Sequence, residues 1–223
     1  MPTEASARPY DLIVLDWDGT VMDSLGVIVA CAQEGARDLE LEVPAENAIR
    51  DLVGLKLSII AARLFPQHED LHVRWIERYS FHWINTFLDR LRLLPTAREA
   101  VERLHREGYY LAVATGKSRR GLNRDFDSTG LGKLFLASRT VDEAPSKPSP
   151  VMLLDIVDEL GMQKNRTLMV GDTTHDLQMA VNGGIDAVGV LSGSHDEATL
   201  SEHSPVAVLD DLGALPDWLA SKS

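Results

Sequence analysis

Two aspartates directly follow a short apolar stretch near the start of the chain, and their spacing suggests chemistry. Residues 11–15, DLIVL, have the pattern of a buried strand, so Asp16 and Asp18 fall where that strand leaves the core. Alternate residues of an extended chain share one side, which would direct both carboxylates into one pocket and leave Trp17 to pack inward. Carboxylates at a strand end suit divalent-metal binding and acid–base work. An ordinary polar turn, in which Asp and Gly are common, is the alternative interpretation.

A hydroxyl and a glycine amide follow a second apolar run, residues 111–114. Thr115 supplies the hydroxyl and Gly116 the amide, just before a predicted helix N-terminus. Such a helix start binds anions, because its backbone N–H groups point outward and are unpaired. Taken alone, the pattern is more typical of an ordinary strand-to-helix turn.

A lysine in a proline-rich connector is the third candidate. Lys147 stands between two prolines in the segment PSKPSP, residues 145–150. Proline at the next position favours an extended backbone, which gives the ammonium group a defined direction. A lone lysine is more often a solvated surface charge, so this residue gains meaning only in combination with the others.

Two more aspartates follow a third apolar run, residues 167–170. Asp172 lies at the end of this predicted strand, and Asp176 lies in the first turn of a helix that would begin at Thr173. The two carboxylates can then approach one pocket, or they can serve as N-cap and helix-dipole partners. The sequence Ser-His-Asp at 194–196 contains the letters of a hydrolase triad, but adjacent residues cannot adopt triad geometry, so a polar loop is predicted.

The elements that must position these groups are predicted strands alternating with helices. No strand pattern interrupts residues 24–92, which we call the helical block, and a long helix is expected at 68–91. Alternation of strands and helices from residue 95 onward favours a parallel sheet covered on both faces. The predicted fold is an α/β, doubly wound parallel sheet with an inserted helical domain. Its strands are expected at 10–15, 109–114, 134–137, 167–170, 187–190 and 206–209.

The carboxyl ends of parallel strands meet at one edge of a doubly wound sheet, so these groups should converge there. Such a site can hold Mg²⁺ and a phosphoryl group together, because the metal and a lysine offset the repulsion between phosphate and an attacking carboxylate. The converging side chains are those of Asp16, Asp18, Thr115, Lys147, Asp172 and Asp176.

The charge and composition of the chain limit the binding partners and the location that we expect for it. The chain has 223 residues, 44% of them hydrophobic, and a formal net charge of −12, which disfavours nucleic acid and anionic membrane surfaces. Cys31 is the only cysteine, so an intrachain disulfide is excluded and a cytoplasmic location is expected. Residues 1–9 are polar, so no signal peptide is expected, and no apolar run reaches membrane-spanning length.

In their order along the chain, the four motifs resemble those of the haloacid dehalogenase superfamily of aspartyl-phosphate phosphotransferases, most closely its phosphoglycolate phosphatase-like branch. The motifs are DWDGT at 16–20, Thr115, Lys147 before proline, and GDTTHD at 171–176. The helical block resembles the small α-helical cap of this family. The resemblance implies a core domain with the superfamily's Rossmann-like fold, made of residues 1–22 and 93–223, and a cap domain of residues 23–92.

The resemblance also implies a role for each motif residue. Asp16 would be the nucleophile that accepts the phosphoryl group, and Asp18 the general acid for the leaving alcohol and then the base for water. Thr115 and Gly116 would bind phosphate oxygens, and Lys147 would orient and neutralise the phosphate. The expected cofactor is Mg²⁺, with ligands from Asp16, Asp18 (through its backbone carbonyl), Asp172 and Asp176.

Three functions remain open within this resemblance. A phosphatase acting on a small phosphorylated metabolite is favoured, because Asp18 is absent from dehalogenase-type and phosphonate-cleaving members. A sugar phosphomutase usually carries an arginine soon after the glycine that matches Gly54; here Lys56 would have to replace it. A pyrophosphatase is the other alternative. Outside the family, receiver-type phospho-acceptor modules share these residue types but lack a large helical insertion after the first strand.

Substrate choice is expected to depend on the cap. Arg50, Lys56 and Arg63 are the candidate contacts for a second anionic group of the substrate, with solvated helix charges as the alternative. The sequence leaves the substrate and the oligomeric state open.

Overall fold

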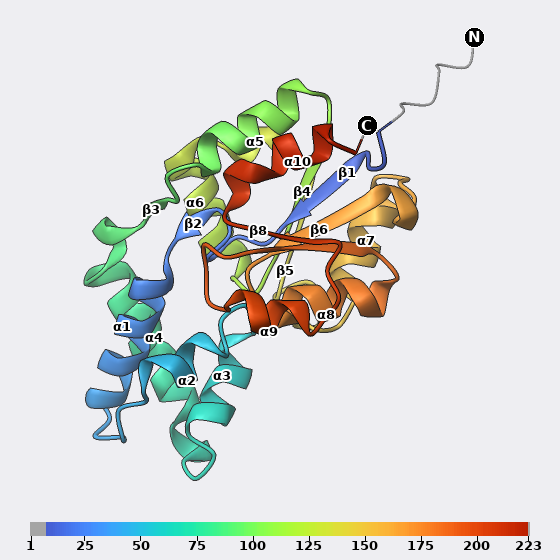
Figure 1. The fold of residues 1–223 in the computed structure, drawn as a ribbon. Helices are drawn as coiled ribbons and strands as arrows, with labels where there is room; N and C mark the ends of the chain where they lie inside the picture. Colours follow the sequence, from blue (N-terminus) through green and yellow to red (C-terminus); the bar gives the residue numbers. More distant parts are fainter. Residues whose placement is uncertain (1–7, 223) are drawn as a thin grey trace.

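A six-stranded parallel sheet forms the centre of the computed structural model, which describes residues 8–222 (Figure 1). Residues 1–7 of the predicted core segment and Ser223 lie outside the described residues. The strand order is β5-β4-β1-β6-β7-β8, which confirms the predicted α/β parallel sheet. The strands are β1 (Leu12–Leu15), β4 (Tyr110–Thr115), β5 (Ala137–Thr140), β6 (Thr167–Gly171), β7 (Asp186–Val190) and β8 (Ala207–Leu209).

β1 lies between β4 and β6, and its register aligns the carboxyl ends of all three strands. Leu15 pairs with Val113 of β4 and with Val170 of β6. The amide of Asp16 continues the ladder by donating to the Val170 carbonyl oxygen at 2.9 Å. The residues that follow these strands therefore meet at one sheet edge.

Side chains of β1 alternate between two hydrophobic clusters, one on each face of the sheet. Ile13 and Leu15 pack with helices α5 (Ala97–Arg106), α6 (Arg119–Thr129) and α10 (Leu215–Ala220). Leu12 and Val14 pack with the helices of the opposite face, which are α7 (Val151–Glu159), α8 (Thr174–Gly183) and α9 (Glu197–Ser201). This period of two continues past the strand, because Trp17 belongs to the cluster of Leu15 and is fully buried.

The helical block has a hydrophobic cluster of its own, built from residues between Leu25 and Leu91. Its helices are α1 (Leu25–Arg37), α2 (Glu46–Arg50), α3 (Leu57–Leu64) and α4 (His72–Asn85). Two short strands that the sequence did not reveal, β2 (Met22–Asp23) and β3 (Arg92–Leu93), flank it and pair antiparallel. In Figure 1 the block lies beside the sheet rather than on either face of it.

Two predicted elements differ from the structure, and two short helices were not predicted. The long helix expected at 68–91 is divided into a 3₁₀ turn at Glu69–Leu71, then α4, then a second turn at Leu88–Arg90. The strand expected at 134–137 begins only at Ala137, because Leu134 and Phe135 instead bury their side chains against the cluster around Trp17. The helices α9 and α10 are too short to give a periodic signal. None of the helices in the described part of the chain is long and apolar enough to cross a membrane.

Candidate active site

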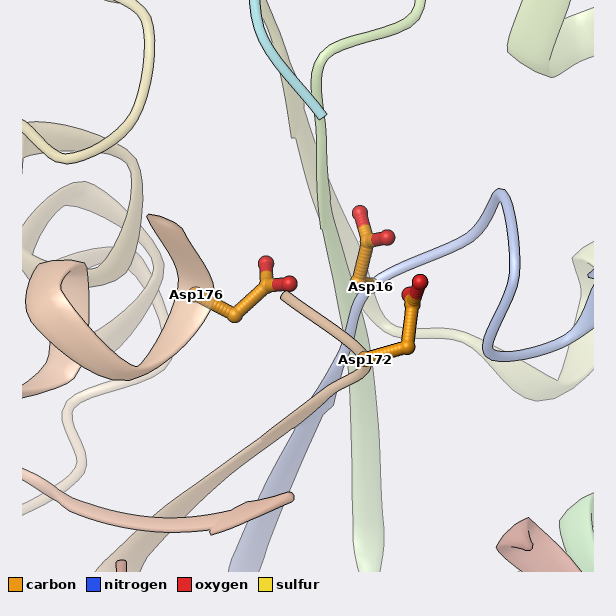
Figure 2. A group of neighbouring side chains, drawn as sticks. All are labelled: Asp16, Asp172 and Asp176. Carbon is orange, nitrogen blue, oxygen red and sulfur yellow. The ribbon is translucent and has the colours of Figure 1, made fainter. Parts of the chain in front are cut away.

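Three buried carboxylates meet at the carboxyl edge of the sheet (Figure 2). Asp16 follows β1, Asp172 follows β6, and Asp176 comes from the first turn of α8. Each offers an oxygen, and these oxygens lie within 4.8 Å of one another. The structure thus brings together three of the four aspartates that the motifs singled out.

Lys147 is the cation of this group. Its Nζ lies 2.5 Å from Asp16 Oδ1 and 2.6 Å from Asp176 Oδ1, and its side chain is fully buried. Burial alone would lower the pKa of Lys147, but the adjacent Asp16 and Asp176 raise it, so the side chain remains an ammonium. One positive charge therefore faces three carboxylates.

The negative charge that Lys147 does not neutralise contributes to raised pKa values of the carboxyl groups. Burial and repulsion from Asp176 raise the pKa of Asp172 to about 7, against hydrogen bonds that favour its ionised form. Burial also raises the pKa of Asp16; Lys147 opposes this, whereas Asp176 and Asp172 add to it. The Oδ2 atom of Asp16 is buried and has no hydrogen-bond partner. A set of hard oxygen donors with surplus charge and an unpartnered oxygen fits a divalent cation such as Mg²⁺.

Hydrogen bonds fix the orientation of Asp172. The Thr20 hydroxyl donates to Oδ1 at 2.9 Å, and the Ser194 amide donates to Oδ2 at 2.8 Å. Gly19 has φ +89°, and a Cβ there would overlap the Asp172 carboxylate. The predicted polar loop at 194–196 therefore supports an acidic side chain, a role that the sequence did not indicate because the contact spans 22 residues.

Asp176 serves the helix and the site at once. It forms a capping box with Thr173, whose amide and hydroxyl donate to Asp176 Oδ2 at 3.1 and 2.7 Å. Its other oxygen, Oδ1, accepts from Lys147. The N-cap of α8 is Thr173, so the alternative in which Asp172 caps this helix is wrong.

Thr115 and Gly116 lie at the end of β4, the strand next to β1. Thr115 is buried, and its hydroxyl accepts from the Lys117 amide at 3.2 Å. Gly116 faces the helical block, where a Cβ would overlap the carbonyl oxygen of Gly54. The lack of a side chain at Gly116 is what allows this close approach.

Asp18 is not a member of the group of three carboxylates. Its Oδ1 lies 3.0 Å from Nζ of Lys117, which is also 3.3 Å from Asp125 Oδ2. Asp16 and Asp18 therefore pair with different cations, Lys147 and Lys117. The metal role expected of Asp18 was through its backbone carbonyl, and that expectation stays a prediction.

Lys117 is the residue of this site that sequence reasoning missed. Its ammonium lies over the ring of Trp83 in α4, 4.3 Å from the ring centroid, and its side chain is only 8% exposed. Burial opposes the charge, but Asp18 and Asp125 raise the pKa of Lys117. The available signal was its position directly after Thr115 and Gly116; its partners are too distant in sequence to be inferred.

The segment 51–56 of the helical block rests on the sheet edge. His175 Nε2 lies 3.0 Å from the Asp51 carbonyl oxygen, and the Lys56 amide donates to Ser146 Oγ at 3.0 Å. Lys56 and Asp18 both line a cavity of about 430 Å³. Arg50 does not line that cavity and pairs with Glu46 on its own helix, at 2.8 Å.

The model of the haloacid dehalogenase-like hydrolases matches residues 13–190. The carboxylate group, Lys147 and the strands β4 to β7 fall within that range. The chain therefore belongs to the haloacid dehalogenase-like hydrolase family, as its motifs predicted.

Named relatives resemble this chain over most of its length. A phosphoglycolate phosphatase of Vibrio parahaemolyticus is 28% identical over 218 residues, which cover 94% of this chain and 96% of the relative. A probable phosphatase of Dickeya dadantii, IndB, is 31% identical over 204 residues and 89% of each chain. The crystal structure of a predicted phosphoglycolate phosphatase from Haemophilus somnus has a TM-score of 0.85 at 24% identity, covering 94% of this chain and 98% of that one. At this identity the crystal structure shows a shared fold.

Replacing Lys117 by methionine should destabilise the protein by about 3–5 kcal/mol, because it leaves Asp18 without its cation and the buried carboxylate of Asp125 with only the more distant Arg124. Adding Asp125→Asn should recover part of the loss. Denaturant unfolding of the single and double variants measures this. Equal stability of Lys117→Met and the unmodified protein would show that the buried pairs contribute nothing.

Proposed function

We propose that the protein is a Mg²⁺-dependent phosphatase that hydrolyses a small phosphomonoester through an aspartyl-phosphate on Asp16. The observation that carries the proposal is the environment of Asp16, a buried carboxylate with one oxygen 2.5 Å from Lys147 and the other unpartnered. The named phosphatase relatives support it, and the phosphoglycolate phosphatase among them makes a phosphoglycolate-like ester the first candidate substrate.

In this proposal Asp16 attacks phosphorus, and the bond from phosphorus to the leaving oxygen breaks. Lys147 lies beside the nucleophile and reduces the repulsion between its negative charge and that of the phosphate. Thr115 and Gly116, at the end of the adjacent strand, bind the phosphate oxygens through a hydroxyl and a backbone amide. All of these groups are held by strand ends or by the rigid connector before α7.

Asp18 is the proposed proton donor and acceptor. It protonates the leaving alcohol oxygen and then takes a proton from the water that cleaves the aspartyl-phosphate. Asp18 lines the cavity, whereas the side chain of Asp16 contacts Lys147. This separation agrees with proton transfer by Asp18 and nucleophilic attack by Asp16. Lys117 is the positioning residue that holds the Asp18 carboxylate in place.

Asp16, Asp172 and Asp176 are the side chains that would hold Mg²⁺. When bound, the ion supplies positive charge that draws the phosphate to the site and stabilises the charge that develops during transfer. Thr20 and Ser194 fix Asp172 for this task through the hydrogen bonds described above.

The helical block is the proposed cap domain, residues 23–92. Its own hydrophobic cluster and its two flanking strands support treating it as a separate unit. The block contacts the sheet edge through Asp51, Gly54 and Lys56. In this closed position it excludes water from the site of phosphoryl transfer.

Replacement of Asp16 by asparagine should lower kcat for phosphomonoester hydrolysis by more than about 1,000-fold, because the amide cannot form the covalent intermediate. Steady-state assays with Mg²⁺ measure this. The matched control is Asp23→Asn, which changes an exposed carboxylate of β2 and should retain activity. Turnover by Asp16→Asn at the rate of the unmodified enzyme contradicts the covalent mechanism.

Replacement of Asp18 by asparagine should affect esters unequally. Alkyl phosphates should lose about 10²–10⁴-fold in kcat/KM, because their alkoxide needs a proton, whereas 4-nitrophenyl phosphate should lose much less. The ratio of kcat/KM for the two esters in each variant is the measurement. An equal loss for both esters would assign Asp18 a role other than protonation of the leaving group.

Mg²⁺ should raise the melting temperature more at pH 8 than at pH 5. The pKa of Asp172 is about 7 when folded and 3.8 by its ordinary value, so the native metal-free protein binds the extra proton between about pH 4 and 7. Protonated Asp172 therefore stabilises the native metal-free protein fully below about pH 4, and this stabilisation is lost as the pH rises to about 7 and above. Above pH 7 the ionised carboxylates are free for the cation, which stabilises the native state.

Thermal unfolding with and without Mg²⁺ at the two pH values tests this expectation. Asp172→Asn should lose most of the Mg²⁺ response, and Asp70→Asn, which changes an exposed carboxylate, should keep it. A response to Mg²⁺ that is equal in all three proteins places the cation elsewhere.

A further inference from the structure

The cavity lined by Asp18 and Lys56 is bounded by two unlike walls. One wall belongs to the sheet domain and carries charged groups before and within α6, among them Lys117, Arg120 and Arg124. The other belongs to the helical block and is mainly apolar, although Lys56, Ser58 and Ser80 also line it. Its apolar side chains from α3 and α4 are Leu57, Ile60, Ile76, Tyr79, Trp83 and Ile84.

The apolar wall follows from the sequence of α4. Ile76, Ser80, Trp83 and Ile84 stand at positions i, i+4, i+7 and i+8, so they form a single stripe along the helix. Ser80 is the one small polar residue of that stripe. At the end of the stripe Ile84 is 42% exposed, although an isoleucine in contact with water gains nothing from that position. An apolar stripe that faces an open cavity is stabilised when a ligand covers it.

The charged wall is only partly paired within the protein. Lys117 contacts Asp18 and Asp125, and Asp142 accepts from the Arg119 amide at 2.8 Å. Arg124 lies 3.9 Å from Asp125, but its buried Nε has no hydrogen-bond partner. The cavity therefore leaves a guanidinium group without a hydrogen bond on one side and apolar side chains without a cover on the side of the helical block.

The size of the cavity is the second observation. Glycolate, with two carbons and three oxygens, would occupy roughly 150 Å³ at about 30 Å³ for each water-sized atom. The cavity holds about 430 Å³, within the range of pockets for larger small molecules. Its closing segment is already seated, because Gly54 contacts Gly116 and Lys56 contacts Ser146. The volume that glycolate would leave unfilled therefore does not arise from an open position of the helical block.

We infer that the preferred substrate is a phosphomonoester whose leaving alcohol carries a bulky apolar group, aromatic or branched aliphatic, which lies against the α4 stripe. The inference rests on the proposed function, since Asp18, the proposed proton donor, lines this cavity and places the leaving oxygen against it. A two-carbon acid such as glycolate would leave most of the α4 stripe uncovered. The apolar group would cover Ile76 and Ile84, and its binding energy would raise kcat/KM.

The test compares primary alkyl phosphates, whose leaving alcohols have similar basicity but different size. We expect kcat/KM with Mg²⁺ to rise at least about tenfold from ethyl phosphate to 2-phenylethyl phosphate, as burial of an aromatic ring predicts. The value for 2-phenylethyl phosphate should also exceed that for 2-phosphoglycolate. If ethyl phosphate or 2-phosphoglycolate is hydrolysed as well as the phenylethyl ester or better, the inference is overturned.

A filled cavity gives an independent readout. Ser80→Phe places an aromatic ring within the stripe and should reduce the ratio of kcat/KM for 2-phenylethyl over ethyl phosphate at least about fivefold. Glu77→Phe adds the same ring to an exposed position of α4 outside the cavity and should leave the ratio unchanged. Because the ratio is taken within one variant, a partly unfolded preparation does not alter it. An unchanged ratio in Ser80→Phe rejects the α4 stripe as the binding surface.

Failure of the proposed function would be seen separately. If no ester is hydrolysed faster by the unmodified protein than by Asp16→Asn, the phosphatase mechanism is wrong. The dissociation constants of the two alkyl phosphates for Asp16→Asn, measured by calorimetry with Mg²⁺, then test the cavity alone. Tighter binding of the phenylethyl ester by at least about tenfold supports the inference, and equal binding of both esters rejects it.

Discussion

The contact of one ammonium group with two carboxylates makes the rest of this site possible. Without Lys147, the buried carboxylates of Asp16, Asp172 and Asp176 would face one another with no opposite charge, an arrangement that burial penalises by several kcal/mol per ion. Lys147 removes part of that penalty and leaves the site short of positive charge. The proposed binding of a divalent cation depends on this incomplete neutralisation, and the bound cation would in turn attract the phosphate group.

Parallel topology explains why such distant residues can cooperate. β1 is paired on both sides, so whatever follows β1, β4 and β6 is delivered to one edge regardless of sequence separation. The same pairing holds Asp16 by its backbone, through the bond from its amide to the Val170 carbonyl. A carboxylate attached to a central strand loses little freedom when it reacts, which is the condition for efficient covalent catalysis.

Sequence patterns predicted the sheet and the convergence of Asp16, Asp172, Asp176 and Lys147, because apolar runs and strand-end polar residues are local signals. They could not reveal Lys117, whose partners Asp18 and Trp83 come from two distant parts of the chain. The strand expected at 134–137 was misplaced because a short apolar run reads alike in a strand and in a buried turn.

The pairing of β2 with β3 determines where this chain can accept insertions and deletions during evolution. The two ends of the helical block leave the sheet domain side by side, with Met22 opposite Leu93. A segment whose ends are adjacent closes a loop of almost any length at little extra entropic cost. Insertions, deletions or a wholly different set of helices between these two residues would leave β1 and the carboxylates in place. Substrate range can therefore diverge in this lineage while the chemistry at the sheet edge stays constant.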